Sequence, residues 1–188
     1  MLYVTLRPIA QRDLEAVSRL IFDAVHHGTT VMYTAEQRAA WMPSVRRGGI
    51  WYRRLMQGDG WVAVKRGDIV GVITMTDCGY IDLVFVAPSM TGHGVGGMLI
   101  KHIISSARMR GLICLITDAS LIAAPLFARH GWRILRRQRV RRNGTHLLNV
   151  RMGLLLRQPA YGIYRSYGSR WRCLSASFAE SYVSCSTV

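Results

Sequence analysis

The sequence has few acidic residues, few cysteines and few prolines for a chain of 188 residues. Its 10 Asp and Glu residues stand against 25 Lys and Arg residues, a formal net charge of +15 at pH 7. The four cysteines have neither the spacing of a metal site nor that of a disulfide framework, so we expect no metal, reduced thiols and a cytoplasmic location. With 5 prolines and 50% hydrophobic residues, the chain has the composition of a folded domain rather than a disordered polymer.

Long apolar runs are also missing. No uninterrupted apolar stretch approaches the roughly 18 residues that span a bilayer, and the first residues lack the pattern of a signal peptide. We therefore expect no membrane partner. The length fits one domain with a tail. We assign residues 1–156 to the domain. Residues 157–188, rich in Tyr, Ser, Gly and Arg without clear periodicity, form a C-terminal tail of unknown order.

The excess positive charge comes almost entirely from arginine, because Lys65 and Lys101 are the only lysines. A basic surface attracts polyanions such as nucleic acid, membrane or a phosphorylated cofactor. The arginines are spread along most of the chain without an RNA-binding signature. The pattern therefore disfavours nucleic acid as the main partner.

Hydrophobic periodicity and turn residues predict a chain that mixes strands and helices. The Thr34 capping box predicts a helix start, and Asn143-Gly144 predicts a hairpin turn. The predicted strands are 3–8, 61–65, 69–76, 80–86, 112–117, 132–140 and 146–154, and the predicted helices are 12–27, 34–41, 49–56, 97–110 and 120–130. This order indicates an α/β fold with one sheet of mixed direction and one parallel crossover.

The most informative segment is the loop Thr91–Gly97, which follows a predicted strand, contains four glycines and opens onto a helix. Glycines permit positive φ and leave no side chain between backbone amides and a ligand. The unpaired N–H groups of the first helical turn, reinforced by the helix dipole, bind anions. No acidic side chain lies between Pro88 and Gly97. The segment therefore predicts a site for a pyrophosphate.

Two other interpretations of this loop exist. Gly92-x-Gly94-x-x-Gly97 matches the dinucleotide fingerprint, and Asp118 follows at about the expected 20 residues. A dinucleotide-binding turn, however, follows its strand directly, whereas residues 88–91 intervene here, and the second half of a doubly wound sheet is missing. A nicotinamide cofactor is therefore disfavoured. A glycine-rich turn that binds nothing remains the other alternative.

Val86-x-Pro88 followed by Gly92-x-Gly94-x-Gly96 resembles the acetyl-CoA motif of GNAT acetyltransferases, and the resemblance extends over roughly residues 3–156. The segment 33–41 resembles an uncharacterised bacterial branch of that superfamily. The resemblance implies the GNAT fold, with a single mixed, mostly antiparallel sheet and its parallel βαβ crossover at the cofactor site. It implies an acetyl-CoA-dependent N-acetyltransferase that acts on a primary amine of a small molecule, peptide or protein. A non-catalytic acyl-CoA-binding module is the alternative, and a homodimer is compatible with either.

The resemblance also implies where the cofactor binds. The pantetheine arm pairs with the strand 84–86, and the amides of the glycine loop hold the pyrophosphate. Thr91 stands where the family usually has Arg or Gln, and His93 either helps to neutralise phosphate or is an exposed loop residue. The expected cofactor contacts are Val84, Phe85, Val86, Thr91, Gly92, His93, Gly94, Val95, Gly96, Gly97, Ser120 and Phe127.

Asp82 is the candidate general base. It lies four residues before Val86, on the same strand face by period-two parity, and histone acetyltransferases of the superfamily carry a catalytic Glu at the matching place. It would take the amine proton directly or through water, while a backbone N–H near Val86 stabilises the oxyanion; a structural carboxylate is the alternative. Phe127 stands where many members have a Tyr that acts as the general acid. We therefore expect the departing CoA thiolate to take its proton from solvent, Tyr80 or Tyr33.

Candidate acceptor contacts come from the first two helices. His26 ends the first predicted helix, near where acceptors lie in the family, and Tyr33 and Trp41 could shape the acceptor pocket. Each also has a simpler interpretation, since a histidine at a helix end is often a surface residue and aromatic residues at helical positions usually belong to the core. The basic chain disfavours polycationic acceptors.

Overall fold

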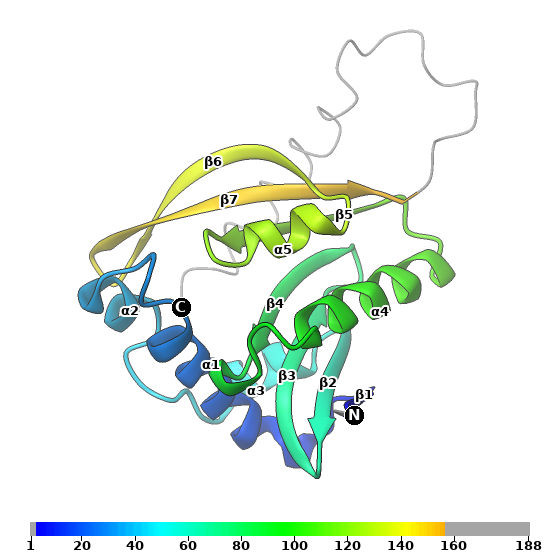
Figure 1. Ribbon diagram of the computed structural model, residues 1–188, viewed down its shortest axis with the longest axis horizontal. Coiled ribbons are helices and arrows are strands. Elements are labelled where there is room, and N and C mark those ends of the chain that lie inside the picture. Colours follow the sequence, from blue (N-terminus) through cyan, green and yellow to red (C-terminus); the bar gives the residue numbers. More distant parts are fainter. Residues whose placement is uncertain (1–2, 157–188) are drawn as a thin grey trace, which may run out of the picture. The chain divides into compact units, whose positions relative to one another are not determined.

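The computed structural model describes residues 3–156 and shows a seven-stranded sheet with helices on both faces (Figure 1). The predicted tail lies outside these residues. The strands are β1 (Thr5–Pro8), β2 (Asp59–Lys65), β3 (Asp68–Met75), β4 (Tyr80–Val86), β5 (Cys114–Ser120), β6 (Arg133–Arg142) and β7 (Thr145–Leu155). The α-helices are α1 (Leu14–Gly28), α2 (Ala35–Trp41), α3 (Gly49–Met56), α4 (Val95–Met109) and α5 (Ala124–Arg129), and two short 3₁₀ helices are η1 (Gln11–Asp13) and η2 (Pro88–Met90).

The strand order is β1-β2-β3-β4-β5-β7-β6, and every neighbouring pair is antiparallel except β4 and β5. The α4 crossover joins these two parallel strands. The prediction of a mixed, mostly antiparallel sheet with one parallel crossover is therefore confirmed.

The parallel pair is short. Only Tyr80 with Ile116 and Ile81 with Thr117 are in register, although β4 continues to Val86 and β5 to Ser120. Beyond these residues the two strands separate, as Figure 1 shows. The sheet thus splits into a half made of β1–β4 and a half made of β5, β7 and β6, with the glycine loop following the free end of β4.

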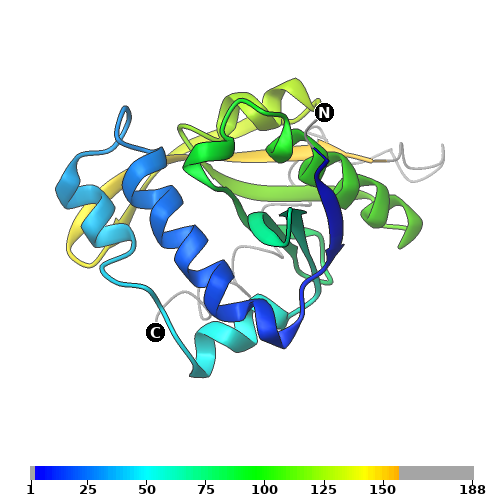
Figure 2. The same ribbon diagram turned by 60° about the horizontal axis from the view of Figure 1, so that its bottom comes forward.

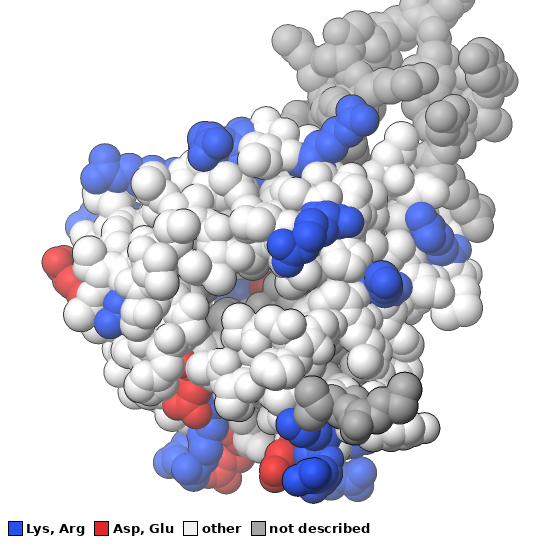
Figure 3. Space-filling view, in the orientation of Figure 1, with Lys and Arg blue, Asp and Glu red and all other residues white. Residues whose placement is uncertain are grey.

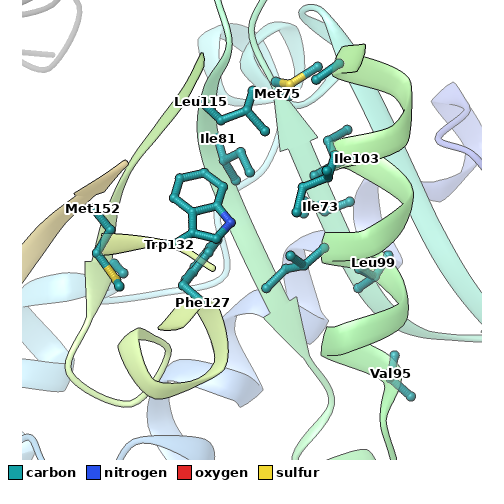
Figure 4. Packing of buried hydrophobic residues seen from close by; sticks show 14 of the residues in the cluster. Ile73, Met75, Ile81, Val95, Leu99, Ile103, Leu115, Phe127, Trp132 and Met152 are labelled. Carbon is teal, nitrogen blue, oxygen red and sulfur yellow. The ribbon is translucent and has the colours of Figure 1, made fainter. Parts of the chain in front are cut away.

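Two apolar cores lie on the opposite faces of the sheet. On one face, α4 buries Leu99 and Ile103 against β3 residues such as Ile73, and Phe127 packs nearby (Figure 4). On the other face, α1 and α3 cover β2, β3 and β4 (Figures 1 and 2). The amphipathic pattern predicted for α4 is confirmed, since its apolar stripe is buried. Because helices pack on both faces of β3 and β4, the position of β4 is well fixed.

Two predicted boundaries shift. The helix predicted at 120–130 begins at Ala124, because β5 extends through Ser120 by pairing with β7. The helix predicted from Gly97 begins at Val95, so the last two glycines of the loop belong to its first turn. Among residues 3–156, no helix is long and apolar enough to cross a membrane.

Candidate cofactor and acceptor site

The glycine loop adopts the backbone that its sequence requires. Gly92 has φ 81° and Gly94 has φ 83°, in the left-handed region that side chains with a Cβ rarely enter. Gly94 is the residue before α4 and supplies no side-chain cap. The first hydrogen bond of the helix runs from the Met98 N–H to the Gly94 carbonyl at 3.0 Å, so the N–H groups of residues 95–97 precede the helical ladder. Together with the dipole of a 15-residue helix, these amides form an anion site.

Three of the four glycines of the loop, Gly92, Gly94 and Gly96, have two different purposes. A Cβ on Gly92 or Gly94 would meet nothing within 4 Å, and the loop from Thr91 to Gly94 is exposed. A Cβ on Gly96 would come 2.7 Å from Leu126 Cδ2, so this glycine lets α5 approach α4. The first two glycines therefore leave space at the surface for a ligand, whereas Gly96 serves packing. This open cradle of amides fits a pyrophosphate.

The His93 side chain lies on this loop. Its Nδ1 is 3.0 Å from the Thr91 carbonyl oxygen, which ties the exposed ring to the loop. The other ring nitrogen, Nε2, remains directed away from that contact and can meet a phosphate.

The edge of β4 beyond Ile81 offers backbone groups to a ligand. The Ala87 N–H donates to the Val70 carbonyl at 2.9 Å, so by period-two parity the backbone of Phe85 faces β3. The backbone groups of Val84 and Val86 then face the gap on the β5 side. An extended, amide-containing chain such as pantetheine fits this edge, because it can form strand-like hydrogen bonds with these two residues.

Polar side chains gather where β4 and β5 are still paired. Both oxygens of Asp82 accept hydrogen bonds of 2.6 Å from Arg54 of α3. Asp118 of β5 accepts bonds of 2.8 and 2.9 Å from Arg151 of β7, and the Tyr80 hydroxyl lies 3.3 Å from its Oδ2. Burial raises the pKa of Tyr80 well above its usual range, and the negative charges of Asp118 and Asp82 raise it further. The structure thus brings the two predicted catalytic residues near enough for the charge of Asp82 to act on Tyr80.

The register of β4 corrects one argument made from sequence. Leu83 pairs with Thr74 and Ile81 pairs with Met75, so Asp82 is the extra residue of a β-bulge. The regular alternation of side chains between the two faces of β4 is therefore interrupted at Asp82. The inference that Asp82 shares a strand face with Val86 is wrong. Its carboxylate instead contacts α3, on the face opposite α4. Its role as general base stays a prediction.

Tyr33 and Trp41 connect the first two helices to the sheet. The Tyr33 hydroxyl donates to the Leu148 carbonyl at 2.7 Å and accepts from the Leu121 N–H at 3.0 Å, and its side chain is buried. Burial raises the pKa of Tyr33. Trp41 packs against the Tyr33 ring at 5.4 Å and against Phe85 at 6.2 Å, measured between ring centroids. Trp41 therefore extends from the helices to the cofactor strand, whereas the Tyr33 hydroxyl is held by two backbone partners.

Three further predicted contacts have structural partners. His26 stacks on Phe22 with ring centroids 4.2 Å apart, and its Nε2 lies 2.8 Å from the Met42 carbonyl oxygen. The Ser120 hydroxyl accepts from the Ala123 N–H at 3.2 Å, which shapes the turn into α5. Phe127 is fully buried and packs edge-on against Trp132, so it belongs to the core rather than to the cofactor surface (Figure 4).

Sequence reasoning missed Arg54 and Arg151, the partners of the two aspartates. Each arginine is about 30 residues away from its aspartate, and nothing in a single sequence selects it among 25 basic residues. In the sequence, no feature of Asp118 indicates an arginine partner. Its position opposite Arg151 follows from the pairing of β5 with β7.

Comparisons with known proteins agree with this geometry. A family model described as an acetyltransferase (GNAT) domain matches residues 29–154. An uncharacterised N-acetyltransferase of Escherichia coli K12, YafP, is 30% identical over 149 residues, which cover 79% of this chain and 94% of that protein. The family match spans the glycine loop and the polar residues around Asp82 and Asp118.

Solved structures show the same fold. A GCN5-related N-acetyltransferase (aminotransferase, class-II) from Rhodopseudomonas palustris superimposes with a TM-score of 0.78 at 28% identity, covering 82% of this chain and 98% of that one. The putative acetyltransferase yncA of Salmonella typhimurium, solved with acetyl-CoA, gives a TM-score of 0.63 at 20% identity and covers 87% of this chain and 99% of that one. The second likeness concerns the fold alone. The fold implied by the sequence motif is confirmed.

Proposed function

Because the chain belongs to the GNAT acetyltransferase family, we propose that it transfers the acetyl group of acetyl-CoA to a primary amine through a ternary complex. The observation that carries this proposal is the separation of β4 from β5 beside the glycine loop. It provides a free strand edge for the pantetheine arm and an amide cradle for the pyrophosphate at one end of the sheet. The yncA structure with acetyl-CoA and a Thermoplasma acidophilum PaiA structure with coenzyme A, of similar fold, support the choice of donor.

In this proposal, Val84 and Val86 hold the donor along β4, and the N–H groups of residues 95–97 bind its pyrophosphate. A backbone N–H near Val86 polarises the thioester carbonyl. The amine nitrogen attacks that carbonyl carbon, the C–N bond forms and the C–S bond breaks. The protein's main contribution is the alignment of the two substrates.

Asp82 takes the proton of the attacking amine, directly or through a water molecule. Arg54 occupies two of the roughly four lone-pair sites of the carboxylate, so sites remain for a water or an amine. The bidentate pair fixes the orientation of the carboxylate on the bulge. Asp82 is thus held in one orientation and can still accept a proton.

Solvent supplies the proton of the departing thiolate. The raised pKa of Tyr80 makes its phenol a weaker acid, which suits a hydrogen-bond donor to Asp118 better than a proton donor. Tyr33 has the same limitation, and both sides of its hydroxyl are already engaged. We assign positioning roles to both tyrosines.

Thiol release from acetyl-CoA with a panel of primary amines tests the proposal. We expect Asp82→Asn to lower kcat by about 100-fold or more while the Kd for CoA stays unchanged, since general-base catalysis contributes about 10²–10⁴. Asp13→Asn is the matched control, because Asp13 forms a similar bidentate pair with Arg7, outside the network around β4. CoA binding without turnover of any amine would favour the non-catalytic alternative, whereas equal kcat in wild type and Asp82→Asn would show that Asp82 is a structural carboxylate.

A further inference from the structure

Three arginines from different parts of the chain form a cluster, and one of them, Arg54, pairs with Asp82. Arg46 belongs to the segment between α2 and α3, Arg54 to α3 and Arg142 to the end of β6. The guanidinium carbons of Arg46 and Arg54 lie 5.3 and 5.8 Å from the centroid of the same Trp51 ring. The end of β6 is held against α2, because the Asn143 side-chain amide donates to the Ala40 carbonyl at 2.8 Å.

The charges of this cluster are poorly compensated. Partial burial lowers the pKa of Arg46, and the positive charges of Arg54 and Arg142 lower it further, so both of these arginines are near enough to repel Arg46. Among the ion pairs of residues 3–156, only Arg54 of the three has a carboxylate partner, Asp82. Like charges at this separation oppose folding unless an anion lies among them.

The cluster is built to present hydrogen-bond donors. A guanidinium that stacks on an aromatic ring uses its flat face, and its in-plane N–H groups stay available for a carboxylate or phosphate. The Trp51 ring is itself fixed, because its Nε1–H donates to Ser18 Oγ at 2.8 Å. Arg46 and Arg142 are exposed, so a ligand can reach them.

The other arginines of β6 differ from this cluster. β6 is an edge strand with six arginines, and exposed charges along such an edge prevent pairing with other chains. Arg133 is one of them, exposed at the opposite end of the strand, where it pairs with Gly153. Arg142 alone among the six contributes to the lowered pKa of Arg46.

We propose that Arg46 and Arg142 bind an anionic group of the acceptor, a carboxylate or phosphate, while its amine reaches toward Asp82 and the edge of β4. Arg54 connects the two ends of the acceptor site, since it contacts both Trp51 and Asp82. The acceptor class is therefore a primary amine with an anionic group several bonds away. This inference rests on the proposed acetyl transfer for its second readout only, because anion binding can be measured without turnover.

Trp51 provides the first readout. With CoA present at saturation, the protein is titrated with 6-aminohexanoate against 6-aminohexan-1-ol, and with O-phosphoethanolamine against ethanolamine. The Trp51 signal is the fluorescence of the wild type minus that of Trp51→Phe. We expect a saturable change with at least one anionic amine and none with its neutral match. Arg46→Gln and Arg142→Gln should each weaken binding of the anionic amine by about 10- to 100-fold. Arg133→Gln, which removes one positive charge from β6 as Arg142→Gln does, should leave this binding unchanged.

Acetylation kinetics provide the second readout. The ratio of kcat/KM for the anionic amine to that for its neutral match should exceed about tenfold in wild type and fall toward unity in Arg46→Gln, through KM rather than kcat. Equal Trp51 responses to anionic and neutral amines, or equal effects of Arg46→Gln and Arg133→Gln, would overturn the inference. If no amine is acetylated while the Trp51 response stays selective, the anion site stands and the proposed function fails.

Discussion

Three aspartates of this chain each accept two hydrogen bonds from one arginine, and the three pairs differ in what surrounds them. Asp82 lies on β4, the strand that we propose holds the donor, and Asp118 lies across the gap with Tyr80 bound to it. Asp13 pairs with Arg7 at 2.6 and 2.8 Å, before α1, and its Oδ2 also accepts the Ala10 N–H. Residue type alone therefore does not distinguish a catalytic carboxylate from a structural one, whereas the residues around the carboxylate do.

The Asp13 pair makes a prediction about acid stability. The hydrogen bond from Arg7 lowers the pKa of Asp13, so the stability from this pair is present above the unfolded pKa of about 3.9 and is lost as pH falls through the folded value. We expect Asp13→Asn to lower the free energy of unfolding by about 2 kcal/mol at pH 7. Urea unfolding at pH 7 and pH 3 measures this difference, which should shrink at the lower pH.

Asp77→Asn is the control, because Asp77 is 83% exposed in its ion pair with Arg110. Exposed pairs contribute little, so this variant should change stability by less than about 1 kcal/mol. A cost of Asp13→Asn that stays the same from pH 7 to pH 3 would contradict the account.

At the scale of elements, four hydrogen bonds join the β6–β7 hairpin to α2 and to Tyr33, just before it. The Asn143 side chain donates to the Ala40 carbonyl, the Gln37 side chain donates to the His146 carbonyl at 3.0 Å, the Thr145 hydroxyl donates to the Glu36 carboxylate at 3.1 Å, and the Tyr33 hydroxyl donates to the Leu148 carbonyl. The Tyr33 hydroxyl also accepts from the Leu121 N–H after β5, so it connects the start of α2 with β7 and with the end of β5. The proposed acceptor end of the site depends on these contacts.

Tyr33→Phe tests whether this hydroxyl is structural. The change leaves one backbone N–H and one carbonyl unpaired, so we expect a loss of about 1–3 kcal/mol in the free energy of unfolding. The alkaline limb of the kcat–pH profile should not move, because the thiolate takes its proton from solvent. A shifted alkaline limb with unchanged stability would instead identify Tyr33 as the acid.

Local chemistry made several elements predictable from sequence. The Thr34 capping box is present as expected, with Gln37 N–H bonded to Thr34 Oγ1 at 3.2 Å and Thr34 N–H bonded to Gln37 Oε1 at 3.0 Å. Asn143 and Gly144 adopt φ 44° and 84°, as the two-residue hairpin turn requires. These signals lie within a few residues of the structure that they determine.

Features that depend on distant residues were not predictable. The bulge at Asp82 arises from pairing with β3, and the extension of β5 through Ser120 arises from pairing with β7. Partners of aspartates and the stacking of Arg46 on Trp51 depend on how the chain folds back. The proposed cofactor side of the site is local in sequence, whereas the proposed acceptor side combines residues of α3, β4, β6 and the segment before α3.

At the scale of the whole molecule, the positive charge on the face seen in Figure 3 is scattered rather than gathered in one patch. Figure 3 shows basic side chains spread over the visible face and acidic ones toward its left and lower parts. A net charge of +15 attracts anionic ligands from solution, and acetyl-CoA is one such ligand. The general field brings anions to the surface, and the local geometry of the glycine loop and of the Arg46 cluster determines where they bind.

The central claim concerns the divided sheet and its glycine loop. It is that coenzyme A binds there with its pyrophosphate at the start of α4. Gly94→Ala and Gly111→Ala are a matched pair, since these residues have φ 83° and 75° and a Cβ at either meets nothing within 4 Å. Each substitution should cost about 1–2 kcal/mol of stability from the left-handed backbone.

Isothermal titration of coenzyme A into the wild type and these two variants is the most direct measurement. The account predicts that Gly94→Ala weakens the Kd for coenzyme A by about tenfold or more, because it displaces the amides of the cradle and places a methyl group where the ligand lies. Gly111→Ala, at the other end of α4, should bind as the wild type does. Equal affinity of all three proteins would contradict the claim.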